Sequence, residues 1–154
     1  MPDKETLERA EEDKREGKSP STQAGEFVRE EMDHIREGKH GARSTKQAIA
    51  IGLSKARRAG VKLPAPKKGT ASSRTRRQAS RDSAKGKSGQ RKVSSTRSRA
   101  TRRALKREGR SAASRTALAR QARKAAAKRS KASRSRAAKK AASTRRRFSS
   151  SKRK

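Results

Sequence analysis

The sequence predicts a small all-α N-terminal segment of two or three short helices, followed by a long intrinsically disordered basic tail. Residues 66–154 hold 34 Lys/Arg against two acidic residues, which gives this stretch +32 of the chain's net charge of +34. The same stretch has four large apolar side chains, Val93, Leu105, Leu118 and Phe148. We expect this to be too little apolar surface to offset the ordering entropy of so long and so highly charged a segment.

We therefore divide the chain into three parts: a charged, fraying helix and linker (residues 1–20), a helix-turn-helix-like helical hairpin (21–64) and a disordered Lys/Arg/Ser/Ala-rich tail (65–154). The net charge also becomes more positive from the N-terminal part to the C-terminal part. Residues 1–37 hold 12 Asp/Glu and 7 Lys/Arg, whereas residues 38–65 hold 7 Lys/Arg and no acid. Such asymmetry indicates that the basic end has a polyanionic partner.

The first expected helix, residues 3–16, is charged around its whole circumference. Pairs of opposite sign four residues apart, such as Glu5 with Arg9, support it by a few tenths of a kcal/mol each. Its apolar residues are Leu7 and Ala10, and Gly17 ends it. A helix that is polar all round is marginal unless it docks, so we expect it to fray.

The second expected helix, residues 22–37, is amphipathic. Its apolar face consists of Ala24, Phe27, Val28, Met32 and Ile35. Glu31 falls inside this apolar stripe. A carboxylate in that position requires a Lys or Arg from a neighbouring element, because an unpaired buried charge is costly.

The third expected helix, residues 44–59, has the clearest local signals in the chain. Ser44 followed by Gln47 forms a capping box, and Gly60 suits the left-handed position of a Schellman motif. Ala48, Gly52 and Ala56 recur every four residues and form a seam of small side chains. The large side chains of residues 22–37 could fill that seam, which predicts an antiparallel helix pair.

Ile51 lies on the opposite face of this third helix, among polar and basic residues. A lone exposed apolar side chain is ordinary. The alternative is a contact with a partner or a second copy of the chain, because so small a two-helix core is poorly stabilised alone. A homodimer through the helical segment before the tail (residues 1–64, called the head from here on) therefore stays open.

No arrangement of residues indicates an enzyme. The chain has no cysteine, its two histidines (His34 and His40) lack a paired spacing on one helix, and no phosphate-binding glycine motif is present. We expect no metal, no cofactor and no catalytic residues. The longest apolar run, residues 48–53, is far shorter than the roughly 20 residues that span a bilayer, so we expect no membrane partner.

The basic side chains predict binding to nucleic-acid phosphates. Duplex DNA is favoured over single strands because the tail has one aromatic residue for base stacking, while structured RNA stays open. The candidate contacts are Lys39, Arg43, Lys46, Lys55, Arg57, Arg58, Lys62, Lys67, Lys68, Arg74, Arg76, Arg77, Arg97, Arg99, Arg102, Arg103, Arg120, Arg123, Lys124, Lys128, Arg129, Arg145, Arg146 and Arg147.

Two stretches of the head carry a resemblance: GKSPSTQAGEFV (17–28) and IREGKHGARSTKQAIAIGLSKARRAG (35–60). Over about residues 1–64 the chain resembles a family of small basic bacterial proteins of uncharacterised function, some labelled only as DNA-binding. The composition of the tail resembles the Ala/Lys/Arg-rich tails of bacterial histone H1-like proteins. The resemblance implies a bacterial, cytoplasmic and nucleoid-associated setting, and it supplies no catalytic residues.

The function that these observations favour is non-sequence-specific DNA binding by a nucleoid-associated, histone H1-like protein whose tail neutralises and condenses DNA. One alternative is an RNA- or ribosome-associated basic protein. Another is a DNA-binding regulator whose helical hairpin reads sequence. The six-residue connection 38–43 counts against the regulator, because it is longer than the usual 3–4-residue turn of that motif.

Overall fold

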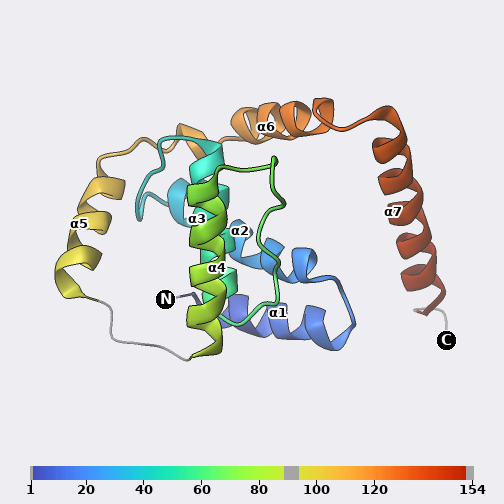
Figure 1. Ribbon diagram of the computed structural model, residues 1–154, viewed down its shortest axis with the longest axis horizontal. Helices are drawn as coiled ribbons and strands as arrows, with labels where there is room; N and C mark the ends of the chain where they lie inside the picture. The colour runs from blue at the N-terminus through green and yellow to red at the C-terminus, as the bar shows by residue number, and fades with distance from the viewer. Residues whose placement is uncertain (1, 89–93, 152–154) are drawn as a thin grey trace. The chain divides into compact units, whose positions relative to one another are not determined.

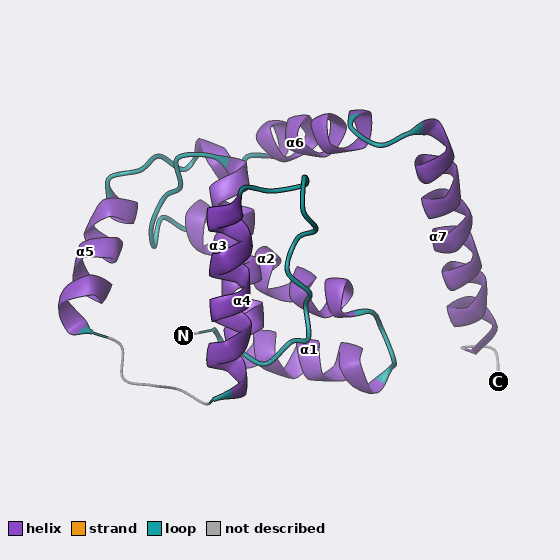
Figure 2. Ribbon diagram, in the orientation of Figure 1, coloured by secondary structure: helices purple, strands orange, loops and turns teal. Residues whose placement is uncertain are grey.

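The computed structural model describes residues 2–88 and 94–151, with side chains up to residue 146. In this part of the chain the helices are joined by loops, and there is no strand (Figures 1 and 2). The helices are α1 (Lys4–Arg15), α2 (Pro20–Arg36), α3 (Thr45–Arg58), α4 (Ser73–Lys87), α5 (Ser95–Lys106), the 3-10 helix η1 (Ser111–Ala113), α6 (Arg115–Ala127) and α7 (Lys131–Ser151). None of these helices combines the length and the apolar character needed to cross a membrane.

The chain forms two compact units, residues 1–117 and 118–154. In the first unit α2 packs against α1 and α3, α3 packs against α4, and η1 contacts both α2 and α3. The second unit consists of the remainder of α6 together with α7. The first unit therefore extends well into the segment that we expected to be a tail.

The start and stop signals of α3 act as predicted. The side chain of Ser44 accepts a hydrogen bond from the backbone N–H of Gln47 at 3.2 Å. At the other end, Gly60 has a φ of +94°, a left-handed conformation that glycine adopts without a Cβ penalty. The N–H groups of Gly60 and Val61 donate to the carbonyls of Arg57 and Ala56, both at 3.1 Å. This pair of bonds is the Schellman motif.

The predicted antiparallel pair is the centre of the first unit. Ala24 and Ala56 belong to one buried cluster with Phe27, while Val28, one turn later in α2, faces Gly52, one turn earlier in α3. A Cβ added to Gly52 would lie 2.7 Å from the Cα of Val28. The seam of small residues thus lets the two backbones approach closely, as the sequence predicted.

We expect Gly52→Ala to lower the free energy of unfolding by about 1–3 kcal/mol, because the added methyl overpacks the α2–α3 contact. The matched control is Gly25→Ala on α2, where nothing lies within 4 Å of the added Cβ. That change should raise stability by about 0.5–1 kcal/mol through helix propensity alone. Urea denaturation of both variants measures the difference, and equal effects would contradict the close approach.

Helix α1 is docked on α2, in contrast to the fraying that we expected. Thr6 and Ala10 are buried, 1% and 6% exposed, and Leu7 packs at the edge of the Phe27 cluster. The guanidinium of Arg9 also donates from Nε to Glu26 at 2.8 Å. Polar bonds to α2 therefore supplement the small apolar face of α1.

The expectation of a long disordered tail was wrong. Helix α4 lies against α3, where Asp82 is 1% exposed and Ala79 is 4% exposed. The carboxylate of Asp82 accepts hydrogen bonds from Ser54 at 2.6 Å, from Arg58 at 2.8 Å and from Gln78 at 3.1 Å. One of the two acids of the basic segment thus fastens α4 to the head.

A second part of the supposed tail, residues 105–113, is docked on the α2–α3 loop. The N–H of Gly41 donates to the carbonyl of Leu105 at 2.9 Å, and that of Ala42 donates to Gly109 at 3.1 Å. Thr45 donates its hydroxyl to the carbonyl of Ala112 at 2.7 Å, and Arg36 donates to that of Ala113 at 3.1 Å. Ala112 and Ala113 are buried by these contacts.

Two properties of the segment explain why it folds. Its alanines provide burial where no large side chain is present, at Ala79, Ala112 and Ala113. Its serines start helices: the hydroxyl oxygens of Ser72, Ser94, Ser114 and Ser130 each accept an N–H three residues later, at 3.1, 3.5, 3.2 and 3.2 Å. The prediction of a disordered tail took only large apolar residues into account and therefore omitted both contributions.

Candidate functional site

Most predicted phosphate contacts lie on the surface. In the head, Lys39, Arg43, Lys46 and Lys62 are exposed. In the basic segment Arg76 is half-buried, and the side chain of Arg147 lies outside the described residues. The exposed members of this segment are Lys67, Lys68, Arg74, Arg77, Arg97, Arg99, Arg102, Arg103, Arg120, Arg123, Lys124, Lys128, Arg129, Arg145 and Arg146.

Three predicted contacts on α3 are instead engaged within the protein. Lys55 forms ion pairs with Glu30 at 2.9 Å and Glu31 at 2.8 Å. Arg57 is 7% exposed and donates to the carbonyl of Pro64 at 3.3 Å, while Arg58 pairs with Asp82. Helix α3 therefore offers little free positive charge, and it is covered by α2, α4 and η1.

The face of α3 that carries Ile51 lies toward α4 of the same chain. Ser54 and Arg58 lie three and seven residues after Ile51, on the same side of the helix, and both bind Asp82 of α4. Ile51 is half-buried. Helix α4 thus occupies the side where we predicted a partner contact, and a second chain at Ile51 stays a prediction.

A basic hollow lies beside α4, with a volume of about 770 Å³. Its lining comprises Ala65, Pro66, Ser73, Arg76, Arg77, Ser80 and Arg81. Arginine forks and serine hydroxyls are suitable donors to the oxygens of a phosphate. The hollow therefore brings together Arg76 and Arg77, two of the predicted contacts, with Arg81, which the sequence prediction did not include.

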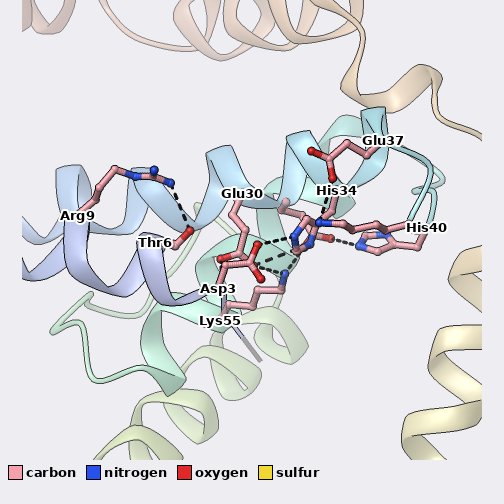
Figure 3. A network of polar contacts seen from close by, with 10 residues as sticks. Asp3, Thr6, Arg9, Glu30, His34, Glu37, His40 and Lys55 are labelled. Atoms are coloured by element: carbon pink, nitrogen blue, oxygen red, sulfur yellow. Dashed lines mark hydrogen bonds and ion pairs between the residues drawn. The ribbon is translucent and has the colours of Figure 1, made fainter.

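The polar cluster consists of Asp3, Glu30, Glu31, His34, His40 and Lys55, contributed by the chain start, α2, the α2–α3 loop and α3. Figure 3 shows Asp3, Glu30, His34 and Lys55 converging, with His40 beside them. Nε2 of His34 lies 3.0 Å from Oδ2 of Asp3, and Nε2 of His40 lies 3.4 Å from Oε1 of Glu31. The two imidazole rings are nearly perpendicular, with centroids 6.2 Å apart.

The electrostatics of the cluster favour ionised acids. Burial alone would raise the pKa of Glu30, yet this pKa is lowered, because Lys55 and the backbone N–H of Asp3 donate to the carboxylate. Burial likewise opposes the charge of Lys55, but its hydrogen bonds to Glu31 and Glu30 raise the pKa of the ammonium. The hydrogen bond with His34 lowers the pKa of Asp3. These contacts favour Asp3 and Glu30 as carboxylates and Lys55 as an ammonium.

Sequence reasoning missed this cluster, although one signal for it was visible. Glu31 was identified as an acid in an apolar stripe that needed a cation, and Lys55 supplies that cation at 2.8 Å. Glu31 is 0% exposed. The two histidines were not expected to form a site, because they lack a paired spacing on one helix. In the structure the loop after α2 turns back and places His40 beside His34.

Comparison with known proteins adds one finding. Residues 17–68 match the model of a family described as "Family of unknown function (DUF6496)". This match covers α2, α3 and the segment after α3, and so includes Glu30, Glu31, His34, His40 and Lys55. No curated protein and no solved structure matches the chain.

Proposed function

We propose that this chain is a non-enzymatic, nucleoid-associated DNA-binding protein that contacts duplex phosphates without reading sequence, in the manner of histone H1-like proteins. The observation that carries the proposal is that most basic side chains of α4–α7 are exposed. Residues 66–154 hold 34 Lys/Arg and two acids, and one of those acids, Asp82, is already paired with Arg58. Phosphates supply the counter-charge that the segment itself lacks.

The helical state of this segment supports duplex DNA as the ligand. Helix α7 has 21 residues, so it is about 31 Å long, and a duplex of that length presents about 18 charges. The basic side chains of α7 that the structure describes are spaced around the helix: Lys131, Arg134, Arg136, Lys139, Lys140, Arg145 and Arg146. A helix of this kind suits a major groove about 12 Å wide, which has phosphates along both walls.

Two alternatives are tested by the same experiments. A basic helical surface also suits structured RNA, so an RNA- or ribosome-associated role is the second candidate. A sequence-reading hairpin has less support. The connection between α2 and α3 runs from 37 to 44, longer than the turn of the DNA-binding motif, and three of the four basic residues of α3 are engaged internally.

We expect binding to random-sequence duplex DNA with a strong dependence on salt. If about 10 phosphate contacts form, the slope of log K against log salt should be about −9. Fluorescence anisotropy with duplexes of different sequence, a single strand and a structured RNA, each at several salt concentrations, gives slope and preference together. A clear preference for the structured RNA would refute the proposal, and a clear preference for one duplex sequence would favour the regulator.

A matched pair of charge variants locates the interface. Changing Arg120, Arg123 and Lys124 together to Gln should weaken binding and make the slope shallower by about 1 for each phosphate that the variant no longer binds. The control changes Lys14, Arg15 and Arg29 to Gln, because these exposed residues lie on the acidic helices α1 and α2. The net charge of the two variants is identical. Equal weakening in both would mean that only total charge matters.

A further inference from the structure

We propose that Glu31, His34 and His40 form a binding site for a divalent transition metal, with Zn²⁺ as the best match. Each residue offers one ligand atom, and these atoms all lie within 4.8 Å of one another. Glu31 is fully buried, and the side chains of His34 and His40 are 12% and 16% exposed. Imidazole with carboxylate is a donor set that zinc commonly takes.

The distance between Glu31 and His40 fits a shared ion better than a direct bond. Nε2 of His40 is 3.4 Å from Oε1 of Glu31, which is longer than the usual 2.7–3.2 Å of an N–H···O hydrogen bond. A tetrahedral zinc ion with bonds of about 2.0–2.1 Å holds neighbouring ligand atoms about 3.3–3.4 Å apart. Among the described residues, none donates a hydrogen bond to this Oε1.

Among the described residues, one nitrogen of each ring lacks a hydrogen bond: Nδ1 of His34, which lies 3.9 Å from Oε1 of Glu30, and Nε2 of His40. Nδ1 of His40 lies 3.1 Å from the carbonyl oxygen of Gly41, and that oxygen can only accept, so Nδ1 carries the hydrogen. Nε2 is then the nitrogen that faces Oε1 of Glu31, and it is the atom of this ring available to a metal. Asp3 orients His34 in the same way through Nε2 at 3.0 Å. Such outer partners commonly fix metal-binding histidines.

Acidic side chains outnumber basic ones in the cluster, which suits a cation. Asp3, Glu30 and Glu31 accompany one lysine, Lys55, whose Nζ lies 2.9 Å from Glu30 and 2.8 Å from Glu31. Glu30 has both oxygens engaged, Oε1 by Lys55 at 2.9 Å and Oε2 by the N–H of Asp3 at 3.1 Å. Lys55 approaches Glu31 at Oε2, so Oε1 is the oxygen left to bind a metal. A fourth position is open to water or a carboxylate.

A metal at this site would tie α2 to the loop that receives residues 105–113. Glu31 and His34 belong to α2, whereas His40 precedes Gly41, whose N–H binds the carbonyl of Leu105. The ion would therefore fix the loop on which the basic segment docks. The site is independent of the nucleic-acid proposal, because none of its three ligands is among the predicted phosphate contacts.

Zinc alone, titrated calorimetrically into the untagged full-length chain after EDTA treatment and dialysis, tests the proposal. We expect about one ion per chain, and a loss of affinity of at least about tenfold in both His34→Gln and His40→Gln. Glu31→Gln should weaken binding similarly. The control is Glu37→Gln, which removes an exposed carboxylate paired with Lys39 at 3.0 Å and should bind zinc as the wild type does.

A measurement on the wild type removes any dependence on how the variants fold. The chain has two histidines, so the ring resonances in a ¹H–¹⁵N spectrum belong to His34 and His40 alone. Zinc should shift both rings at one equivalent, and Co²⁺ should give the visible absorption of a tetrahedral site. No stoichiometric binding, or binding that leaves either ring unshifted, would overturn the proposal.

Discussion

Replacing Gly41 by alanine is expected to release residues 105–113 from the head. A Cβ at this position would lie 1.9 Å from the carbonyl oxygen and 2.4 Å from the carbonyl carbon of Glu108. Both are backbone atoms, so no side-chain rotation relieves the collision. The segment must move away, which breaks its hydrogen bonds from Gly41, Ala42, Thr45 and Arg36. At about 0.5–1.5 kcal/mol each, these four bonds contribute about 2–6 kcal/mol to docking.

Limited trypsin digestion with identification of the cut sites measures the release. Cleavage after Lys106, Arg107 and Arg110 should become at least about tenfold faster, because proteolysis follows the population of the open form. The matched control is Gly109→Ala in the docked segment itself, where an added Cβ meets nothing within 4 Å. If both variants are cut at the wild-type rate, the segment is not held on the loop.

Replacing Asp82 by asparagine is expected to loosen α4 from α3 and to lower the free energy of unfolding by about 1.5–3 kcal/mol, the usual range for a hydrogen bond to a charged group. Asp82 is 1% exposed and accepts from Ser54, Arg58 and Gln78. Asparagine keeps the size of the side chain but loses the charge and one acceptor. The exposed neighbour Arg81, changed to glutamine, is the control and should leave stability within about 0.5 kcal/mol of wild type.

The same contact predicts a dependence on pH. Burial by itself would raise the pKa of Asp82, but the bonds from Ser54, Arg58 and Gln78 lower it below the ordinary 3.8. A carboxyl whose pKa is lower in the folded state stabilises the fold above its unfolded pKa, and this stabilisation is lost as pH falls through the folded pKa. The α3–α4 contact should therefore hold at pH 5–7 and weaken below about pH 4.

Comparing wild type with Asp82→Asn isolates this effect, because Asp3 and Glu30 also have lowered pKa values and act in the same direction. The stability difference between the two proteins should shrink as pH falls below about 4. A double-mutant cycle with Arg58→Gln then gives the coupling energy of the ion pair. A stability difference that stays constant from neutral to acid pH would show that the charge of Asp82 is not what holds α4.

The parts of the fold predicted correctly all rest on signals within a few residues. Ser44 caps α3 because its hydroxyl reaches the N–H three residues later, and Gly60 ends it through bonds within one turn. The seam at Gly52 followed from a spacing of four residues. The need for a cation at Glu31 followed from its place in the apolar stripe, and Lys55 met that need.

The disordered tail was predicted wrongly because residues 66–154 were considered as an isolated polymer. Its helices begin at serines that were counted as low-complexity composition, and its packing uses alanines that were not counted as core. Its two acids were used only to compute a net charge. One of them, Asp82, proved to be a buried anchor to α3.

The sequence by itself determined the helical class of the head, the bounds of α1 and α3 to within one residue and the polycationic character of the rest, because propensity, capping and charge act locally along the chain. Helix α2 begins at Pro20, two residues before the expected start, because Ser19 is its N-cap. Only the tertiary structure decided that Thr45 meets Ala112 across 67 residues, that Ser54 meets Asp82 across 28, and that His40 comes to face Glu31. Such pairings depend on the path of the whole backbone. No local periodicity of the sequence predicts them. For that reason both the docked segment and the histidine cluster could be identified only from the folded chain.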